Sequence, residues 1–189
     1  MTRRARPLTT ALAFQGGLIV VAVGLAWLFG LRPWQDFEFS WTALAIGVAA
    51  TMPIAASLLA LPSGRWRWAD ELTGLVRRFL QLLFRNAWPG AVVAVAALAG
   101  IGEELLFRGV VQAGLIELSS PAIGLVVASI LFGAAHAVSM AYWALATLMG
   151  LYLGLLYHWT GNLLVPILVH ALYDWIAIHF YLGRRAGHA

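Results

Sequence analysis

Apolar runs long enough to cross a lipid bilayer recur along almost the whole chain, and they leave little room for a water-soluble fold. A transmembrane helix needs about 20 predominantly apolar residues. Of the 189 residues, 62% are hydrophobic and 11% are charged, whereas a soluble domain carries roughly 25% charged residues. The sequence therefore predicts an all-α fold: a polytopic integral membrane helical bundle.

About six transmembrane helices are predicted. They cover residues 8–31, 41–61, 87–113, 122–142, 143–157 and 162–181. The fifth segment is short, so we expect it to be tilted or packed inside the bundle. Residues 69–88 differ, because their apolar side chains recur at helical spacing on one face while arginines occupy much of the other. This pattern predicts an amphipathic helix in the membrane interface, and an anchor is favoured over a substrate gate.

The arginines predict how the chain is oriented. They cluster before the first span, between the second and third, and after the sixth: Arg3, Arg4 and Arg6; Arg65, Arg67, Arg77, Arg78 and Arg85; Arg184 and Arg185. With six spans, all three clusters lie on one side, which the positive-inside rule makes cytoplasmic. Every basic residue is arginine, a composition that suggests a GC-rich bacterial genome. We therefore expect the cytoplasmic (inner) membrane of a bacterium, with both termini cytoplasmic.

Several classes of function are excluded by composition. The arginines lie beside apolar segments and form no basic stripe, so no nucleic acid partner is predicted. The chain has no cysteine, which excludes disulfides, thiolate metal sites and a cysteine nucleophile. The expected partners are the lipid bilayer and a membrane or lipid-modified protein or peptide substrate, and no particular oligomeric state is predicted.

The segment GEELLFRG, residues 102–109, places three charges inside the third apolar span. A charge near the bilayer centre costs about 3 kcal/mol and is functional by default. Glu104 and Arg108 are four residues apart on one helical face, which predicts an ion pair. Glu103 points about 100° away from them and has no partner on its own helix.

Three further polar residues lie on two other spans. His136 ends the sequence FGAAH on the fourth span, and HALYD places His170 and Asp174 one helical turn apart on the sixth. Convergence of Glu103 with these three residues would form a polar pocket inside the bundle. Such a pocket supports water activation, with Glu103 as general base, His136 holding the water and His170 donating to an oxyanion.

Metal binding is the alternative for the same residues. No HExxH pair and no GxSxG elbow is present. Glu103, His136 and His170 are nevertheless a set able to ligate zinc or another divalent metal, with activated water as a further ligand. No cofactor is certain from the sequence, and a metal stays open.

The three motifs together resemble the CPBP family, which contains the type II CAAX prenyl endopeptidases, the abortive-infection proteins and the bacteriocin-processing enzymes. EELLFR is similar to its EExxxR motif, FGAAH to FxxxH and HALYD to HxxxN/D, over roughly residues 87–178. The resemblance implies an all-helical intramembrane endopeptidase. It implies water activation by Glu103 and His136 and oxyanion stabilisation by His170 and Asp174. Glu104 and Arg108 complete the first motif.

One motif position is ambiguous. An Asn at position 174 would donate to an oxyanion, whereas an ionised Asp would repel it. Asp174 is therefore expected to be protonated, to orient His170, or to bind a cation.

The expected organisation has three parts. Residues 1–86 hold two N-terminal transmembrane helices and the interfacial helix, residues 87–181 hold the CPBP-like catalytic helical core, and residues 182–189 form a short basic cytoplasmic tail. The expected function is intramembrane peptide hydrolysis. The alternatives are a non-catalytic membrane immunity or assembly factor, a proton-coupled transporter that uses the buried Glu and His residues, and a haem protein ligated by His136 and His170.

A shared site also requires Glu103 and His136 to lie at the same depth. The predicted spans place them on opposite sides of the midplane. We therefore predict that the third helix begins after Trp88 and runs to about Glu117, and that the fourth extends past His136 to about Met140. A separation above about 8 Å between the Glu103 carboxylate and the His136 imidazole would exclude a shared site.

Overall fold

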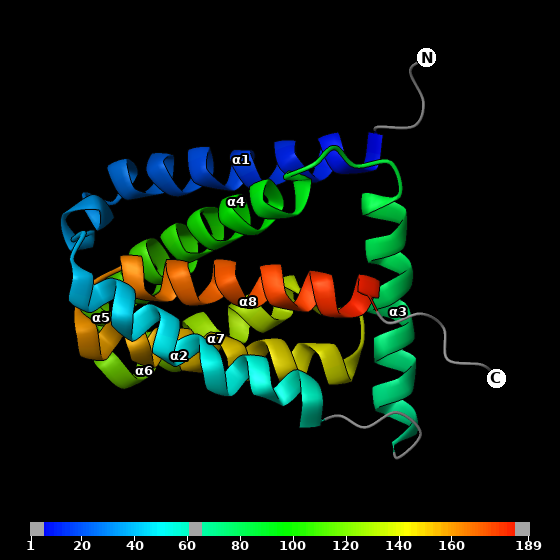
Figure 1. Ribbon diagram of the computed structural model, residues 1–189. Coiled ribbons are helices and arrows are strands. Elements are labelled where there is room, and N and C mark those ends of the chain that lie inside the picture. Colours follow the sequence, from blue (N-terminus) through cyan, green and yellow to red (C-terminus); the bar gives the residue numbers. More distant parts are fainter. Residues whose placement is uncertain (1–5, 61–65, 184–189) are drawn as a thin grey trace.

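The computed structural model describes residues 6–60 and 66–183, and these residues form helices and connecting turns without a strand (Figure 1). The helical elements in chain order are α1 Arg6–Leu28, η1 Pro33–Asp36, α2 Trp41–Ala60, α3 Arg67–Phe84, α4 Ala91–Leu106, η2 Phe107–Gln112, α5 Ala113–Leu118, α6 Pro121–Ala135, α7 Met140–Thr160 and α8 Leu164–Gly183. The predicted all-α membrane bundle is confirmed. Most of the predicted tail 182–189, together with Arg3, Arg4 and Arg65, lies outside the described residues.

The six predicted spans are largely helical, and the fourth is interrupted at residues 136–139. By length and composition, α1, α2, α7 and α8 are able to cross a membrane, and α6 is a shorter apolar helix. The third span consists of α4, the π-helix η2 and α5, which follow one another without a break from Ala91 to Leu118. The prediction of a long third helix that starts after Trp88 is therefore confirmed.

The predicted extension of the fourth helix is wrong. Helix α6 ends at Ala135, and His136 caps it with φ −108° and ψ 10°. Helix α7 begins at Met140, because the Ser139 side chain accepts a hydrogen bond from the backbone N–H of Tyr142 and so supplies an N-cap. The fifth span is consequently 21 residues long and is not the short helix that the hydropathy pattern suggested.

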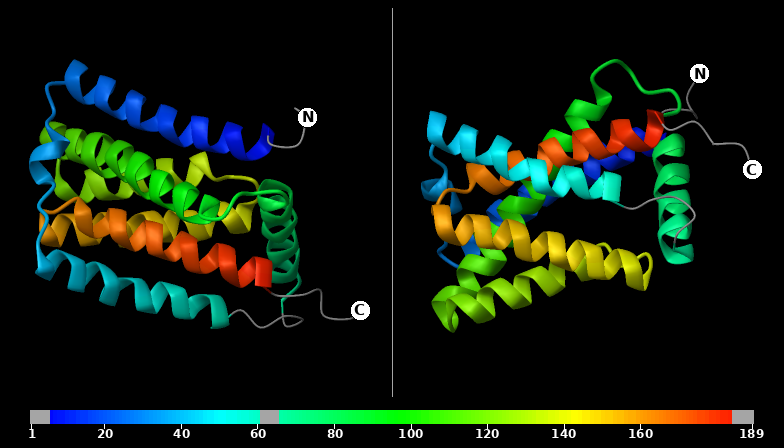
Figure 2. Two further views of the ribbon diagram at one scale, coloured as in Figure 1. Left: turned by 45° about the horizontal axis from the view of Figure 1, so that its top comes forward. Right: turned by 60° about the horizontal axis from the view of Figure 1, so that its bottom comes forward.

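Helix α4 packs between α1 on one side and α8 on the other, while α2 packs on α8 and α6 on α7 (Figures 1 and 2). Small residues let helices approach closely in membranes, and two glycines of α4 do so here. A Cβ at Gly100 would lie 2.8 Å from the carbonyl oxygen of Ile167 in α8. A Cβ at Gly102 would lie 2.9 Å from the carbonyl oxygen of Gln15 in α1. Helix α4 is therefore held at close range by both neighbours.

Helix α3 lies across one end of the bundle, the end at which α1 begins and α8 finishes (Figure 1). It has two adjacent apolar stripes. One is buried against the bundle and comprises Ala69, Leu72, Leu80 and Leu83; the other is exposed and comprises Trp68, Leu75, Phe79 and Leu82. An exposed apolar stripe beside arginines is typical of a helix in a membrane interface, as the sequence predicts.

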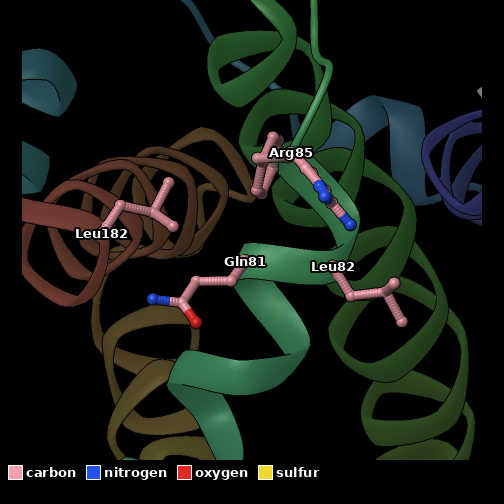
Figure 3. Close-up of a pocket in the computed structure, with 5 residues that line it drawn as sticks. Gln81, Leu82, Arg85 and Leu182 are labelled. Atoms are coloured by element: carbon pink, nitrogen blue, oxygen red, sulfur yellow. The ribbon is translucent and has the colours of Figure 1, made fainter.

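A cavity of about 500 Å³ lies between the end of α3 and the end of α8 (Figure 3). Its lining residues are Gln81, Leu82, Phe84, Arg85 and Leu182. None of the predicted site residues lines this cavity.

At the opposite end of the bundle, the turn between α7 and α8 is tied to the segment around η1. The Asn162 amide donates to the Glu38 carbonyl oxygen at 2.7 Å and accepts from the Glu38 N–H at 3.2 Å. The Tyr157 hydroxyl donates to Asp36 Oδ2 at 2.6 Å. Gly161 has φ +60° and ends α7. These contacts fix the start of α8, which carries two of the predicted site residues.

Candidate active site

Glu103 is buried in α4 and its two carboxylate oxygens face two other helices. Its Oε2 lies 3.4 Å from Nε2 of His136, at the end of α6. Its Oε1 accepts a hydrogen bond from Nε2 of Gln15, in α1, at 2.9 Å. Glu103 and His136 therefore lie well inside the limit of about 8 Å for a shared site. The sequence offers one sign that Gln15 could have a role: it is the single amide side chain in the first predicted span, residues 8–31.

Glu104 points away from Glu103 and forms a buried network. Its Oε1 accepts from Arg108 Nη1 at 2.8 Å, which is the ion pair that the spacing predicted. The same oxygen lies 2.7 Å from Nδ1 of His170, a contact that the sequence did not indicate. Arg108 also donates through Nη2 to the Gly150 carbonyl oxygen of α7 at 2.8 Å. The network joins α4, η2, α7 and α8 through fully buried groups.

His170 connects this network to the pocket. Its Nε2 lies 4.0 Å from Glu103 Oε2 and 3.7 Å from Asp174 Oδ2. The structure thus brings Glu103, His136, His170 and Asp174 together from α4, α6 and α8. The side chains of Glu103 and His170 are 8% and 6% exposed, whereas those of His136 and Asp174 are 26% and 31% exposed. His136 and Asp174 are therefore the partly exposed members of this group, and Glu103 and His170 are the enclosed ones.

Phe132 forms an aromatic wall for the site. Its ring centroid lies 4.6 Å from that of His136 and 5.9 Å from that of His170. The guanidinium carbon of Arg108 lies 4.7 Å from the same ring, within the range of a cation–π contact. The Phe of the FxxxH pattern therefore fixes the positions of three polar groups.

The π-helix η2 carries a second buried amide that the sequence analysis missed. Gln112 is fully buried and donates to the Gly154 carbonyl oxygen at 3.0 Å. Arg108 and Gln112 are four residues apart, as are their acceptors at Gly150 and Gly154. π-helical turns occur frequently at functional sites, and this one aligns two donors with one face of α7.

Three enclosed oxygens of the site have no hydrogen-bond donor among the described residues: Gln15 Oε1, Glu103 Oε2 and Glu104 Oε2. Among residues 6–60 and 66–183, no group of three or more His, Asp or Glu side chains is arranged to hold a metal ion. Whether Glu103, His136 and His170 hold a metal ion stays a prediction from the sequence.

Comparison with known proteins agrees with the three motifs. The family described as type II CAAX prenyl endopeptidase Rce1-like matches residues 75–176. The chain is also 30% identical over 186 residues to the uncharacterised protein YpbD of Bacillus subtilis (strain 168), an alignment that covers 90% of each chain. No solved structure gives a significant match. The matched range contains all six predicted site residues but not Gln15. The chain belongs to the type II CAAX prenyl endopeptidase Rce1-like family, the CAAX-type intramembrane peptidases.

Proposed function

We propose that this peptidase hydrolyses a peptide bond with a water molecule activated between Glu103 and His136. The observation that carries the proposal is the short distance between Glu103 Oε2 and His136 Nε2, 3.4 Å. His136 Nδ1 lies 2.8 Å from the Phe132 carbonyl oxygen and donates to it, so Nε2 of the neutral ring is an acceptor. A water that enters beside this pair donates one hydrogen to Glu103 Oε2 and is oriented by His136.

The proposed reaction follows from this arrangement. The water oxygen attacks the carbonyl carbon of the substrate while its proton passes to Glu103, and a tetrahedral oxyanion forms. When the intermediate collapses, the C–N bond breaks and Glu103 gives the proton to the leaving nitrogen. A single carboxylate thus serves as base and then as acid, and no step requires a metal ion.

His170 is the proposed donor to the oxyanion. Its Nδ1 donates to Glu104 at 2.7 Å, so its Nε2 carries a hydrogen when the ring is an imidazolium. That cation balances the carboxylates around it, and a donor aimed at a developing negative charge is a strong source of catalysis. Asp174 Oδ2 lies 3.7 Å from the same Nε2, which is beyond hydrogen-bond distance. All three expectations for Asp174 stay predictions.

The proposed substrate is a membrane or lipid-modified protein or peptide, because the site lies among helices able to span the bilayer. We further propose that both termini face the cytoplasm of a bacterial cell. The start of α1, the whole of α3 and the end of α8 share one end of the bundle (Figure 2), and α3 carries Arg67, Arg77 and Arg78. Arginines of this kind stay on the cytoplasmic side of a membrane.

A cleavage assay in detergent tests the mechanism. A library of membrane peptides is incubated with the wild-type chain, with Glu103→Gln and with Glu117→Gln, each with and without a strong chelator. Glu117 lies exposed on α5 and is the matched control. We expect the wild type and Glu117→Gln to cut, Glu103→Gln to be inactive, and the chelator to have no effect.

Two other outcomes of the cleavage assay would contradict the proposed mechanism. Loss of cutting with chelator and recovery with zinc would replace the proposed mechanism with a metal-dependent one. If the wild type cuts nothing, the mechanism is contradicted for the library tested. Proton flux in proteoliposomes would then be measured, because buried Glu and His residues also form proton relays.

A further inference from the structure

We infer that Gln15 of α1 is a positioning residue for Glu103, so that the site is completed by a helix outside the range that matches the family. The inference rests on the function proposed above. Gln15 lies 60 residues before the matched range 75–176 begins. It nevertheless contacts the group that is proposed to activate water.

The contact separates the two oxygens of Glu103. Gln15 Nε2 donates to Oε1 at 2.9 Å, while Oε2 faces His136 and His170. The last torsion of a Glu side chain is broad, so a carboxylate without a fixed partner can turn. A donor on Oε1 fixes the plane of the carboxylate and keeps Oε2 directed at the two histidines.

The packing of α1 on α4 brings the amide to this position. The residue before Glu103 is Gly102, and a side chain there would come within 2.9 Å of the Gln15 carbonyl oxygen and 3.3 Å of Ile19. Two apolar clusters hold α1 against its neighbours on either side of this contact. One contains Leu8, Leu83, Ala91 and Val95; the other contains Ala22, Ala26, Leu31 and Val110.

Packing alone gives no reason for an amide here. Gln15 Oε1 is enclosed and has no donor among the described residues, and an enclosed acceptor without a partner is unfavourable. A Leu or Met side chain would fill similar space without that penalty. The amide is therefore explained by its hydrogen bond to Glu103.

The first test separates turnover from binding. Gln15→Met keeps the length of the side chain but removes the donor. We expect kcat to fall about 10- to 100-fold, as for other residues that orient a catalytic group, with KM unchanged because Gln15 is not proposed to touch the substrate. Phe14→Met, at the exposed neighbouring position, should keep the wild-type kcat. An unchanged kcat for Gln15→Met would overturn the inference.

The second test does not depend on activity. Thermal unfolding in detergent is measured for Gln15→Met, for Glu103→Met and for the double variant. We expect Gln15→Met to lower the unfolding midpoint more in the wild-type background than in the Glu103→Met background. Additive shifts would show that the two side chains do not interact and would overturn the inference. If the wild type cuts no peptide, the proposed function fails, whereas this cycle still decides the role of Gln15.

Discussion

Two consecutive glutamates have different environments in this protein. Glu104 is fully buried and its Oε1 is shared by Arg108 and His170. Glu103 is held by one amide, and its Oε2 faces His136 and His170. Because the partners of Glu104 are charged and buried, its loss leaves the Arg108 cation without a counter-ion, which is a strongly unfavourable state. In the proposed mechanism, Glu104 therefore stabilises the fold and Glu103 acts in the reaction.

Glu104→Gln tests this division at the level of one residue. We expect the free energy of unfolding to fall by about 3–5 kcal/mol, the usual effect of removing one partner from a buried ion pair. Glu103→Gln should be closer to the wild type in stability while it abolishes hydrolysis. Unfolding of both variants in the same detergent gives the comparison. An equal loss of stability from both substitutions would contradict the division.

Sequence spacing revealed the local pairs and missed the distant ones. The ion pair of Glu104 and Arg108 follows from a separation of four residues, and the structure has it. The contacts of Gln15 with Glu103 and of His170 with Glu104 join residues 88 and 66 positions apart. Such contacts depend on the rotation of each helix about its own axis, and a run of apolar residues that is nearly uniform around the helix does not define that rotation.

Helix α4 is held at close range by two neighbouring helices, α1 and α8. It touches α1 through Gly102 and α8 through Gly100. Both contacts are between backbones, so neither neighbour can yield by moving a side chain. The same two contacts set the distances from Gln15 to Glu103 and from His170 to Glu104.

Gly100→Ala therefore should separate α4 from α8. The added Cβ would meet the Ile167 carbonyl oxygen at 2.8 Å, and we expect a loss of about 1–3 kcal/mol of stability, as in other overpacked sites, together with reduced activity. Gly24→Ala on α1 is the matched control, since a Cβ there meets nothing within 4 Å. Thermal unfolding and peptide cleavage are measured for both. Equal behaviour of the two variants would show that the close approach at Gly100 is unimportant.

The boundary of α6 shows why hydropathy alone misplaces the end of a helix. Apolar residues continue through residues 130–138 with only His136 between them, so hydropathy predicted a helix that runs past His136. The capping contacts of Ser139 end that run. The local signal for the boundary is a serine before an apolar run, and the longer apolar pattern obscures it.

At the scale of the whole molecule, the two ends of the bundle differ in chemistry. One end carries α3 with its arginines and exposed apolar stripe. The other end carries the turn of η1, with Asp36 and Glu38 bound to α7 and to the turn before α8. The distribution of charge along the sequence predicted this difference, because the arginine clusters lie before the first span, between the second and third, and after the sixth.

Single cysteines test the orientation that follows. The chain has no cysteine of its own, so each introduced thiol is labelled without background. We expect Phe39→Cys, at an exposed position beside η1, to react with a membrane-impermeant maleimide in intact cells. Arg67→Cys, exposed on α3, should react only after the membrane is opened. The reverse pattern would invert the proposed topology.

The succession of Gly102, Glu103 and Glu104 in α4 has a consequence for length variation. Each residue of a helix is turned by about 100° from the last. Gly102 therefore contacts α1, Glu103 faces His136, and Glu104 pairs with Arg108. Removal or addition of one residue within α4 before Gly100 would rotate these three side chains by about 100° and turn each away from its partner. Insertions and deletions among homologues should therefore be absent from this stretch and be found instead in the turn at residues 85–90, where a change in length leaves the phase of α4 intact.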